Sequence, residues 1–267
     1  MAHTTNFPKL LILKTLALLI LISCSKTENS ISDSLEFNEP QVMNIYCQRD
    51  SNTILKSLEY TYEGNNLVSK TTLRNGKIIS KYEFEYNAKD LLLFEIYTST
   101  LSKTEKSYFY NTLDQLTNIK YKFTQFNANG EILEIKEYEE PREYENNLLI
   151  KEWKYWGGFS TYEYNQGKVS TKIDYTKNGI EHHFTTYKYS ENLLIQEKKE
   201  TKVGSLLYLK TFVYDSDNRL TEVLDRENTI EEYDYVNGKL TEKRTYYFGI
   251  DPGYDICYGN YIYRFEY

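Results

Sequence analysis

A tyrosine-x-tyrosine pattern recurs along almost the whole chain, and it constrains the fold more than any other feature. A few polar turn residues follow each copy and lead to a leucine or a similar residue, as from Tyr60 and Tyr62 to Leu67. Further copies begin at Phe84, Tyr108, Tyr162, Tyr187, Phe212 and Tyr233, and a weaker copy lies at Tyr144. A unit that stacks on its own neighbours builds an extended surface. The pattern therefore favours a protein that binds or spaces other molecules over an enzyme.

Each repeat is expected to form two antiparallel strands. From Ile78 to Tyr86 apolar residues alternate with Lys and Glu, which is the pattern of a half-buried strand. Tyr62, Tyr86 and Tyr110 follow one another at intervals of 24 residues, enough for two strands and two short turns. Asn-Gly pairs predict two-residue hairpin turns at 75–76, 129–130, 178–179 and 237–238.

The expected fold class is all-β: a long antiparallel meander of tandem hairpins with roughly 16 to 18 strands. Twist accumulates in such a sheet and its edges need protection, so we expect it to be strongly coiled or closed on itself. The longer step from Tyr110 to Tyr144 contains Pro141 and predicts one enlarged or distorted unit. The 28 tyrosines supply large buried rings with hydroxyl groups that can remain hydrated.

The first residues predict export. Lys9 precedes an apolar run from Leu10 to Ile22, and this run is shorter than the ~20 residues that span a bilayer. The run ends in Leu21-Ile22-Ser23-Cys24, which resembles the lipobox of bacterial lipoproteins. The resemblance implies a signal peptide over residues 1–23 and acylation of Cys24, which anchors the chain to a membrane.

Residues 24–40 comprise the lipidated cysteine and a flexible tether, because small and charged side chains predominate there. Residues 41–267 contain no composition break and are expected to form a single domain. Ser25 stands where many inner-membrane lipoproteins carry aspartate, so the resemblance favours the outer membrane. The periplasmic and the cell-surface face both remain open.

Two segments resemble the YD repeat of Rhs proteins: Phe212 to Thr221, with the sequence FVYDSDNRLT, and Tyr233 to Thr241, with the sequence YDYVNGKLT. The remaining copies replace the aspartate, for example by Glu63 or Asn87. In large relatives such hairpins wind into a shell around a toxin domain, for which this chain is too short. The chain is similar to short lipid-anchored YD-repeat proteins of Bacteroidota.

An outer-membrane β-barrel is an alternative, because the chain ends in the aromatic segment from Tyr261 to Tyr267. A lipid-facing stripe would have to be apolar. Lys210 lies between Tyr208 and Phe212 on the aromatic face, and Glu95 interrupts another strand in the same way. These charges disfavour a spanning barrel.

No catalytic residues, metal site or cofactor are predicted. His182 and His183 are adjacent in an expected strand, so their side chains should point to opposite faces and share no metal. A polysaccharide-acting enzyme remains an alternative, but it would need two acids placed across a cleft. The formal charge of -7 disfavours nucleic acid as a partner.

One aromatic cluster is a candidate ligand site. Tyr155, Trp156 and Phe159 surround the Gly157-Gly158 pair, and exposed rings at such a turn suit a glycan or an envelope protein. Packing in the core is the alternative for these rings.

Cys47 and Cys257 form a possible disulfide, because export leads to an oxidising compartment. Such a bond would bring the two ends of the sheet together, whereas free thiols would not. We therefore expect a non-catalytic, lipid-anchored envelope protein that presents a tyrosine-rich surface.

Overall fold

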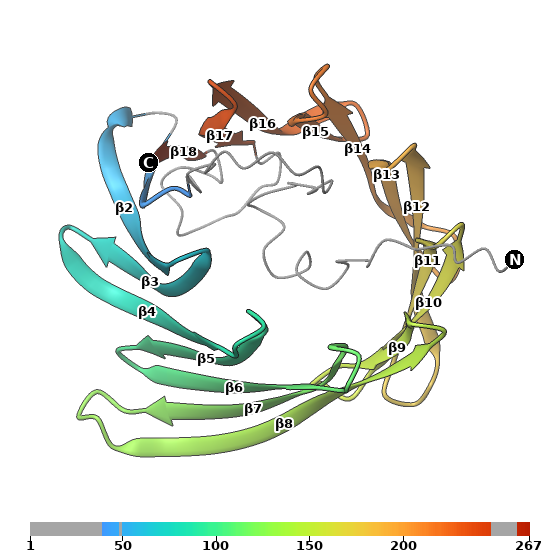
Figure 1. Ribbon diagram of the computed structural model, residues 1–267, viewed down its shortest axis with the longest axis horizontal. Helices are drawn as coiled ribbons and strands as arrows, with labels where there is room; N and C mark the ends of the chain where they lie inside the picture. The colour runs from blue at the N-terminus through green and yellow to red at the C-terminus, as the bar shows by residue number, and fades with distance from the viewer. Residues whose placement is uncertain (1–38, 48–49, 247–260) are drawn as a thin grey trace, which may run out of the picture. The chain divides into compact units, whose positions relative to one another are not determined.

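The computed structural model describes residues 39–47, 50–246 and 261–267, which form 18 antiparallel strands (Figure 1). The strands are β1 (Val42–Cys47), β2 (Asp50–Glu63), β3 (Asn66–Arg74), β4 (Lys77–Tyr86), β5 (Leu92–Ser99), β6 (Ser102–Tyr110), β7 (Leu116–Phe126), β8 (Ile132–Glu145), β9 (Leu148–Trp153), β10 (Phe159–Asn165), β11 (Lys168–Tyr175), β12 (Glu181–Ser190), β13 (Leu193–Thr201), β14 (Leu206–Tyr214), β15 (Leu220–Asp225), β16 (Asn228–Val236), β17 (Lys239–Thr245) and β18 (Tyr261–Glu266).

The sheet is a closed β-barrel in which each strand pairs with the strands before and after it in the chain. The first strand also pairs with the last: Val42 lies opposite Glu266, and Cys47 lies opposite Tyr261. The Asn44 amide donates a 2.6 Å hydrogen bond to the Glu266 carboxylate across this seam. The expected all-β meander and its closure are confirmed.

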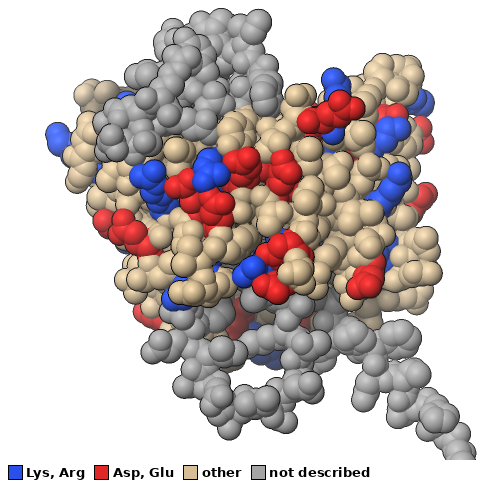
Figure 2. Space-filling model, turned by 90° about the horizontal axis from the view of Figure 1, so that it is seen from above, with Lys and Arg blue, Asp and Glu red and all other residues tan. Residues whose placement is uncertain are grey.

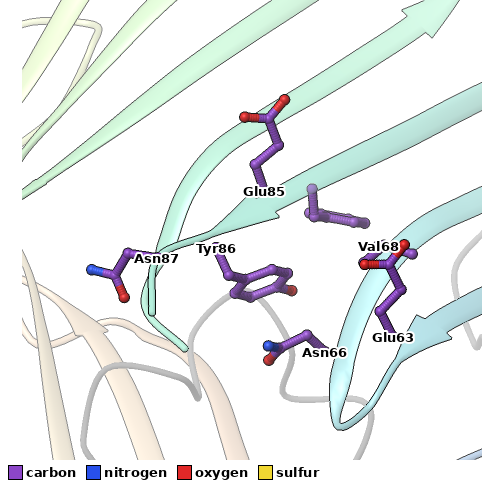
Figure 3. A pocket seen from close by; sticks show the side chains of 7 residues that line it. Glu63, Asn66, Val68, Glu85, Tyr86 and Asn87 are labelled. Atoms are coloured by element: carbon purple, nitrogen blue, oxygen red, sulfur yellow. The ribbon is translucent and has the colours of Figure 1, made fainter. Parts of the chain in front are cut away.

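The two faces of the sheet differ in chemistry, as β4 shows. Glu85 and Tyr86 are neighbours in the chain and point to opposite sides of this strand (Figure 3). We call the side of Tyr86 the tyrosine face and the side of Glu85 the charged face. In β8 the charged face exposes Glu137 and Glu139, while Tyr138 between them is half-buried.

The tyrosine face lines the interior of the barrel. Side chains crowd together on the concave side of a closed sheet, and the tyrosine face is the more buried side in strands such as β8 and β12. Figure 2 shows Lys and Arg interspersed with Asp and Glu on the outer surface that it presents. The lipid-accessible side of this barrel would therefore be the charged face, and Lys210 and Glu95 lie inside.

All even-numbered strands end at the same rim, because the strands alternate in direction. Each carries the second tyrosine of its repeat near this end, so we call it the tyrosine rim. At each of the eight described hairpins of this rim the register shifts at that tyrosine. Thr61 pairs with Ser69 while Tyr62 pairs with Leu67, which leaves Val68 as the extra residue of a β-bulge. Bulges bend and twist strands, so their repetition supports closure of the sheet.

The turns are of two kinds, and the Asn-Gly prediction holds for only one of them. Asn75 and Gly76 adopt φ values of 51° and 70°, which fit a two-residue hairpin turn, and the turn at 237–238 is alike. The pairs at 129–130 and 178–179 instead belong to five-residue turns. The Asn127 amide donates to the Glu131 carbonyl there, and of the Asn-Gly pair only Gly130 has a positive φ.

The enlarged unit between Tyr110 and Tyr144 consists of longer strands. β7 has 11 residues and β8 has 14, and Pro141 pairs in register with Asn118. The unit keeps its hairpin, so the longer sequence step lengthens two strands and adds none.

Candidate functional site

A ladder of tyrosine hydroxyl groups joins consecutive hairpins at the tyrosine rim. Tyr86 Oη donates a 3.0 Å hydrogen bond to the carbonyl oxygen of Leu67, which pairs with Tyr62 at the bulge of the preceding hairpin. The same bond recurs from Tyr110 to Leu92, Tyr144 to Leu116, Tyr164 to Leu149, Tyr214 to Leu194, Tyr235 to Leu220 and Tyr267 to Leu240. These seven tyrosines are thus used for structure and are not available as nucleophiles.

Two buried carboxylates of the tyrosine face, Glu95 and Glu152, are each held by a tyrosine and a cation. Glu95 accepts hydrogen bonds of 2.6 Å from Lys106 Nζ and 2.8 Å from Tyr108 Oη. Burial, followed by the charge of Glu95, raises the pKa of Tyr108. These groups satisfy one another, so they stabilise the wall of the barrel and offer no free acid and base.

Glu152 shows the same arrangement in its most buried form, with 3% of the residue exposed. It accepts hydrogen bonds from Lys154 and Tyr162 and lies 3.5 Å from Arg142 Nη2. Burial by itself raises the pKa of Glu152, but Lys154, Tyr162 and Arg142 outweigh it and lower the pKa below its ordinary value. The carboxylate therefore stays ionised inside the barrel.

The predicted aromatic residues lie on and beside the turn between β9 and β10, at the rim opposite the tyrosine rim. Tyr155 and Trp156 are exposed in the turn, whereas Phe159 is half-buried as the first residue of β10. A Cβ atom on Gly158 would lie 1.8 Å from Trp156 Cζ3, so the indole rests directly on the glycine backbone. The three residues are close in the fold but do not present one common surface.

Phe159 belongs to an aromatic row on the charged face that sequence reasoning missed. The register places Trp153, Phe159 and Tyr175 side by side on three adjacent strands. Phe159 stacks on Tyr175 with 4.5 Å between ring centroids, and Lys151 Nζ lies 4.4 Å from the Phe159 centroid. Both partners cover ring area, so the row is poorly suited to stack on a sugar. Tyr175 lies on the paired strand β11 at the far end of the hairpin, and no local pattern could have linked it to Phe159.

Two contacts hold Tyr155 in place, one to its backbone and one to its ring. Its amide donates a 3.1 Å hydrogen bond to Glu140 Oε1, and its ring meets Tyr138 edge-on at 5.7 Å. The turn is therefore preorganised, and it leaves 58% of Tyr155 and 53% of Trp156 exposed.

The side chains of the two adjacent histidines lie close together, whereas the sequence predicted that they point to opposite faces. His182 and His183 have ring centroids 3.7 Å apart. The prediction that they point to opposite faces is wrong because Tyr175 pairs with Glu181 and Asp174 with His183, which leaves His182 as a bulged residue. Burial, followed by Lys199 and His182, lowers the pKa of His183. Within the described part of the chain, no group of three His, Cys, Asp or Glu residues is placed to hold a metal ion.

Pockets in the described structure are open to solvent. One of about 490 Å³ lies across β2, β3 and β4 and is lined by Glu63, Asn66, Val68, Phe84, Glu85, Tyr86 and Asn87 (Figure 3). Another of about 380 Å³ lies beside Arg244, which is 3.0 Å from Glu232 and also pairs with Asp234. In neither pocket do two acids face each other across a closed cleft.

The cysteine predictions fall largely beyond the described residues. Cys24 and Cys257 lie outside them, as does the signal segment, and for Cys47 only the backbone in β1 is described. The described ranges contain no helix long and apolar enough to cross a membrane.

No family model and no curated protein matches the chain. Among solved structures it is similar to TcdB2-TccC3-Cdc42, with 11% identity and a TM-score of 0.29 over 71% of this chain and 12% of that chain. It is also similar to a porin-like protein from Bacteroides uniformis ATCC 8492, with 15% identity and a TM-score of 0.38 over 64% of this chain and 93% of that chain. Likenesses this weak assign neither an activity nor a partner.

Proposed function

We propose that the chain is a non-catalytic, lipid-anchored protein of the outer membrane whose barrel stands in water and serves as a rigid binding scaffold. The observation that carries the proposal is the charged face. In the middle of adjacent strands it carries pairs such as Lys120 with Glu139, 2.9 Å apart and about half exposed. Charges of both signs at strand centres suit water, whereas a spanning barrel needs an apolar outer band about 25 Å tall.

The interior supports a structural rather than a chemical role. Its buried carboxylates Glu95 and Glu152 are paired with Lys106 and Lys154. Buried tyrosines such as Tyr108 have raised pKa values. A nucleophile needs a neighbouring base that is free to accept its proton. The paired interior instead makes the wall stiff, and a stiff wall holds its outer surface and rims in fixed positions.

The anchor is tested by metabolic labelling with a palmitate analogue, comparing the full chain with Cys24→Ala. We expect the full chain to be labelled and to fractionate with outer membranes, and the variant to be unlabelled. Label retained in Cys24→Ala would contradict anchoring at this residue.

The water-facing barrel is tested separately on residues 25–267. This form should be a soluble, folded protein without detergent and should lack hydrolytic activity on polysaccharides. A protein that folds only in detergent would contradict the proposal and favour the outer-membrane barrel. Outer-membrane barrels have an even number of strands, as this closed sheet does. Release of reducing sugars would favour the enzyme instead.

A further inference from the structure

The rim opposite the tyrosine rim is distinguished by exposed apolar side chains, and we call it the apolar rim. Six consecutive hairpins, from β3–β4 to β13–β14, each carry at least one that is more than half exposed, among them Ile78, Leu101, Ile132, Trp156, Ile180 and Val203. Consecutive hairpins are neighbours in the closed sheet, so these side chains follow one another around the rim. Among the described hairpins of the tyrosine rim, only Leu113 and Val236 are exposed to the same degree.

The two rims also differ in the sign of their exposed charges. The exposed basic residues at or directly beside the described turns of the apolar rim are Arg74, Lys77, Lys177, Lys202 and Arg226, against the acids Glu131 and Glu227. At the tyrosine rim the exposed acids in equivalent positions are Glu63, Asp90, Asp114, Glu145, Glu191 and Asp217, against Lys89. Across the described turns, one end of the barrel is therefore apolar and basic, and the other is polar and acidic.

We propose that the apolar rim docks on an anionic lipid surface, with its hairpin tips entering the headgroup region. Apolar side chains flanked by Lys and Arg gain from burial among acyl chains and from attraction to lipid phosphates. A second copy of the same rim would bring like charges together, so lipid is the better match. The proposal deepens the proposed function, since it presumes a barrel that folds in water.

Trp156 has the geometry of an interfacial residue. One side of its indole lies on Gly158, while 53% of the residue remains exposed. Indole rings prefer the boundary between headgroups and acyl chains, because they combine an apolar body with one hydrogen-bond donor. The ring is already oriented, so docking does not require it to be ordered first.

The proposed anchor does not prevent this orientation. β1 starts at the tyrosine rim, and the residues between Cys24 and Val42 can extend roughly 3.3–3.6 Å each. This reach is about twice the length of a nine-residue strand at ~3.3 Å per residue. The apolar rim can therefore face the membrane in which Cys24 is anchored.

The test uses residues 25–267 and vesicles of phosphatidylethanolamine with phosphatidylglycerol. We expect the protein to float with these vesicles and to bind phosphatidylcholine vesicles less. The combined variant Leu101→Ser, Ile132→Ser, Ile180→Ser and Val203→Ser should lower the partition coefficient at least about tenfold. The matched control, Leu113→Ser with Val236→Ser at the tyrosine rim, should bind like the parent, and circular dichroism should show that both variants are folded.

Fluorescence locates the docked face independently. The chain has two tryptophans, so Trp153→Phe leaves Trp156 as the only reporter. Its emission should shift to the blue on vesicles and be quenched by brominated lipid. A soluble protein that binds no vesicles, or whose Trp156 is not quenched, would overturn the docking proposal and leave the proposed function intact. Self-association that the rim variant abolishes, without vesicle binding, would identify a second copy as the occupant instead.

Discussion

Tyr86 donates its hydroxyl hydrogen to the carbonyl oxygen of Leu67, at the bulge where Leu67 pairs with Tyr62. One tyrosine thus lies at the register shift of its own hairpin and satisfies a carbonyl group in the preceding one. A bulge disturbs the regular ladder of a sheet, and a hydrogen bond from a neighbouring side chain compensates for part of that loss. The repeat is therefore coupled between hairpins as well as within them.

Removing one rung of this ladder should destabilise the barrel modestly. Tyr86→Phe deletes the hydroxyl and leaves a half-buried carbonyl group without this donor, which costs about 1 kcal/mol of unfolding free energy. Denaturant unfolding of residues 25–267 measures the loss. Tyr97→Phe is the control, because within the described structure the Tyr97 hydroxyl makes no hydrogen bond. Equal losses in the two variants would contradict a special role for the rung.

The buried acid Glu152 should matter far more than an exposed one. Glu152→Ala leaves Lys154 and Arg142 without their shared carboxylate inside the wall, which costs roughly 3 kcal/mol. The comparison is Glu83→Ala, which removes an exposed pair with Lys81 and should cost less than about 1 kcal/mol. Similar unfolding midpoints for the two variants would show that the Glu152 cluster contributes little.

Alkaline pH should unfold the barrel. Burial raises the pKa of Tyr60 to about 12 and, together with Tyr144, that of Tyr164 to about 12, whereas the unfolded chain keeps a value near 10.0. Folded-state pKa values above the unfolded ones give stability that is fully present below pH 10 and is lost as the pH rises toward 12.

Denaturant unfolding across this pH range, with tyrosinate absorbance as a second signal, checks this expectation. In Tyr60→Phe the unfolding free energy should decline less with rising pH than in the parent protein, because one of the titrating groups is removed. A stability that does not change between pH 10 and 12 would contradict the burial of these hydroxyl groups.

Gly158→Ala should displace the indole of Trp156. The added Cβ would meet the ring at 1.8 Å and the Tyr175 carbonyl oxygen at 2.5 Å, so both the side chain and the turn must shift. We expect a loss of about 2 kcal/mol and a change in Trp156 emission in the Trp153→Phe background. Gly179→Ala is the control: it has a positive φ but open space around it, so it should lose about 1 kcal/mol and leave the emission unchanged.

The possible disulfide between Cys47 and Cys257 can be tested on the exported protein. The backbone of Cys47 lies opposite Tyr261, whereas Cys257 lies outside the described residues. Intact mass and thiol counting on residues 25–267 from an oxidising periplasm should find no free thiol. Two alkylated cysteines under denaturing conditions would contradict the pairing.

The fold class followed from the sequence because its signals are local. Alternation such as that around Phe84 specifies a strand, and the interval from Tyr62 to Tyr86 specifies two strands in each unit. The structure confirms both and gives the upper end of the expected strand number. The bulge at each repeat was missed because Tyr62 and Leu67 alternate correctly on their own strands, and only their pairing shows the extra residue.

The candidate site was less predictable, because it depends on neighbours that are distant in sequence. Tyr155 and Trp156 were found as a local cluster, but Phe159 stacks on Tyr175, which lies at the far end of the paired strand β11. The contrast between the rims was also hidden, since Ile78 and Val203 each look unremarkable within their own turns. Closure of the sheet gathers them at one end, and closure is a property of all the strands together.

The pairing of β1 with β18 has a consequence for the history of the chain. An antiparallel ring closes only when the number of strands is even. After the gain or loss of a single strand, the first and last strands would be parallel and could not form this antiparallel seam. Duplication or deletion of one complete unit, such as the 24-residue step between Tyr62 and Tyr86, preserves closure and changes only the circumference. Relatives of this protein are therefore expected to differ in size by whole hairpins, in steps set by the gene segment that encodes one of them.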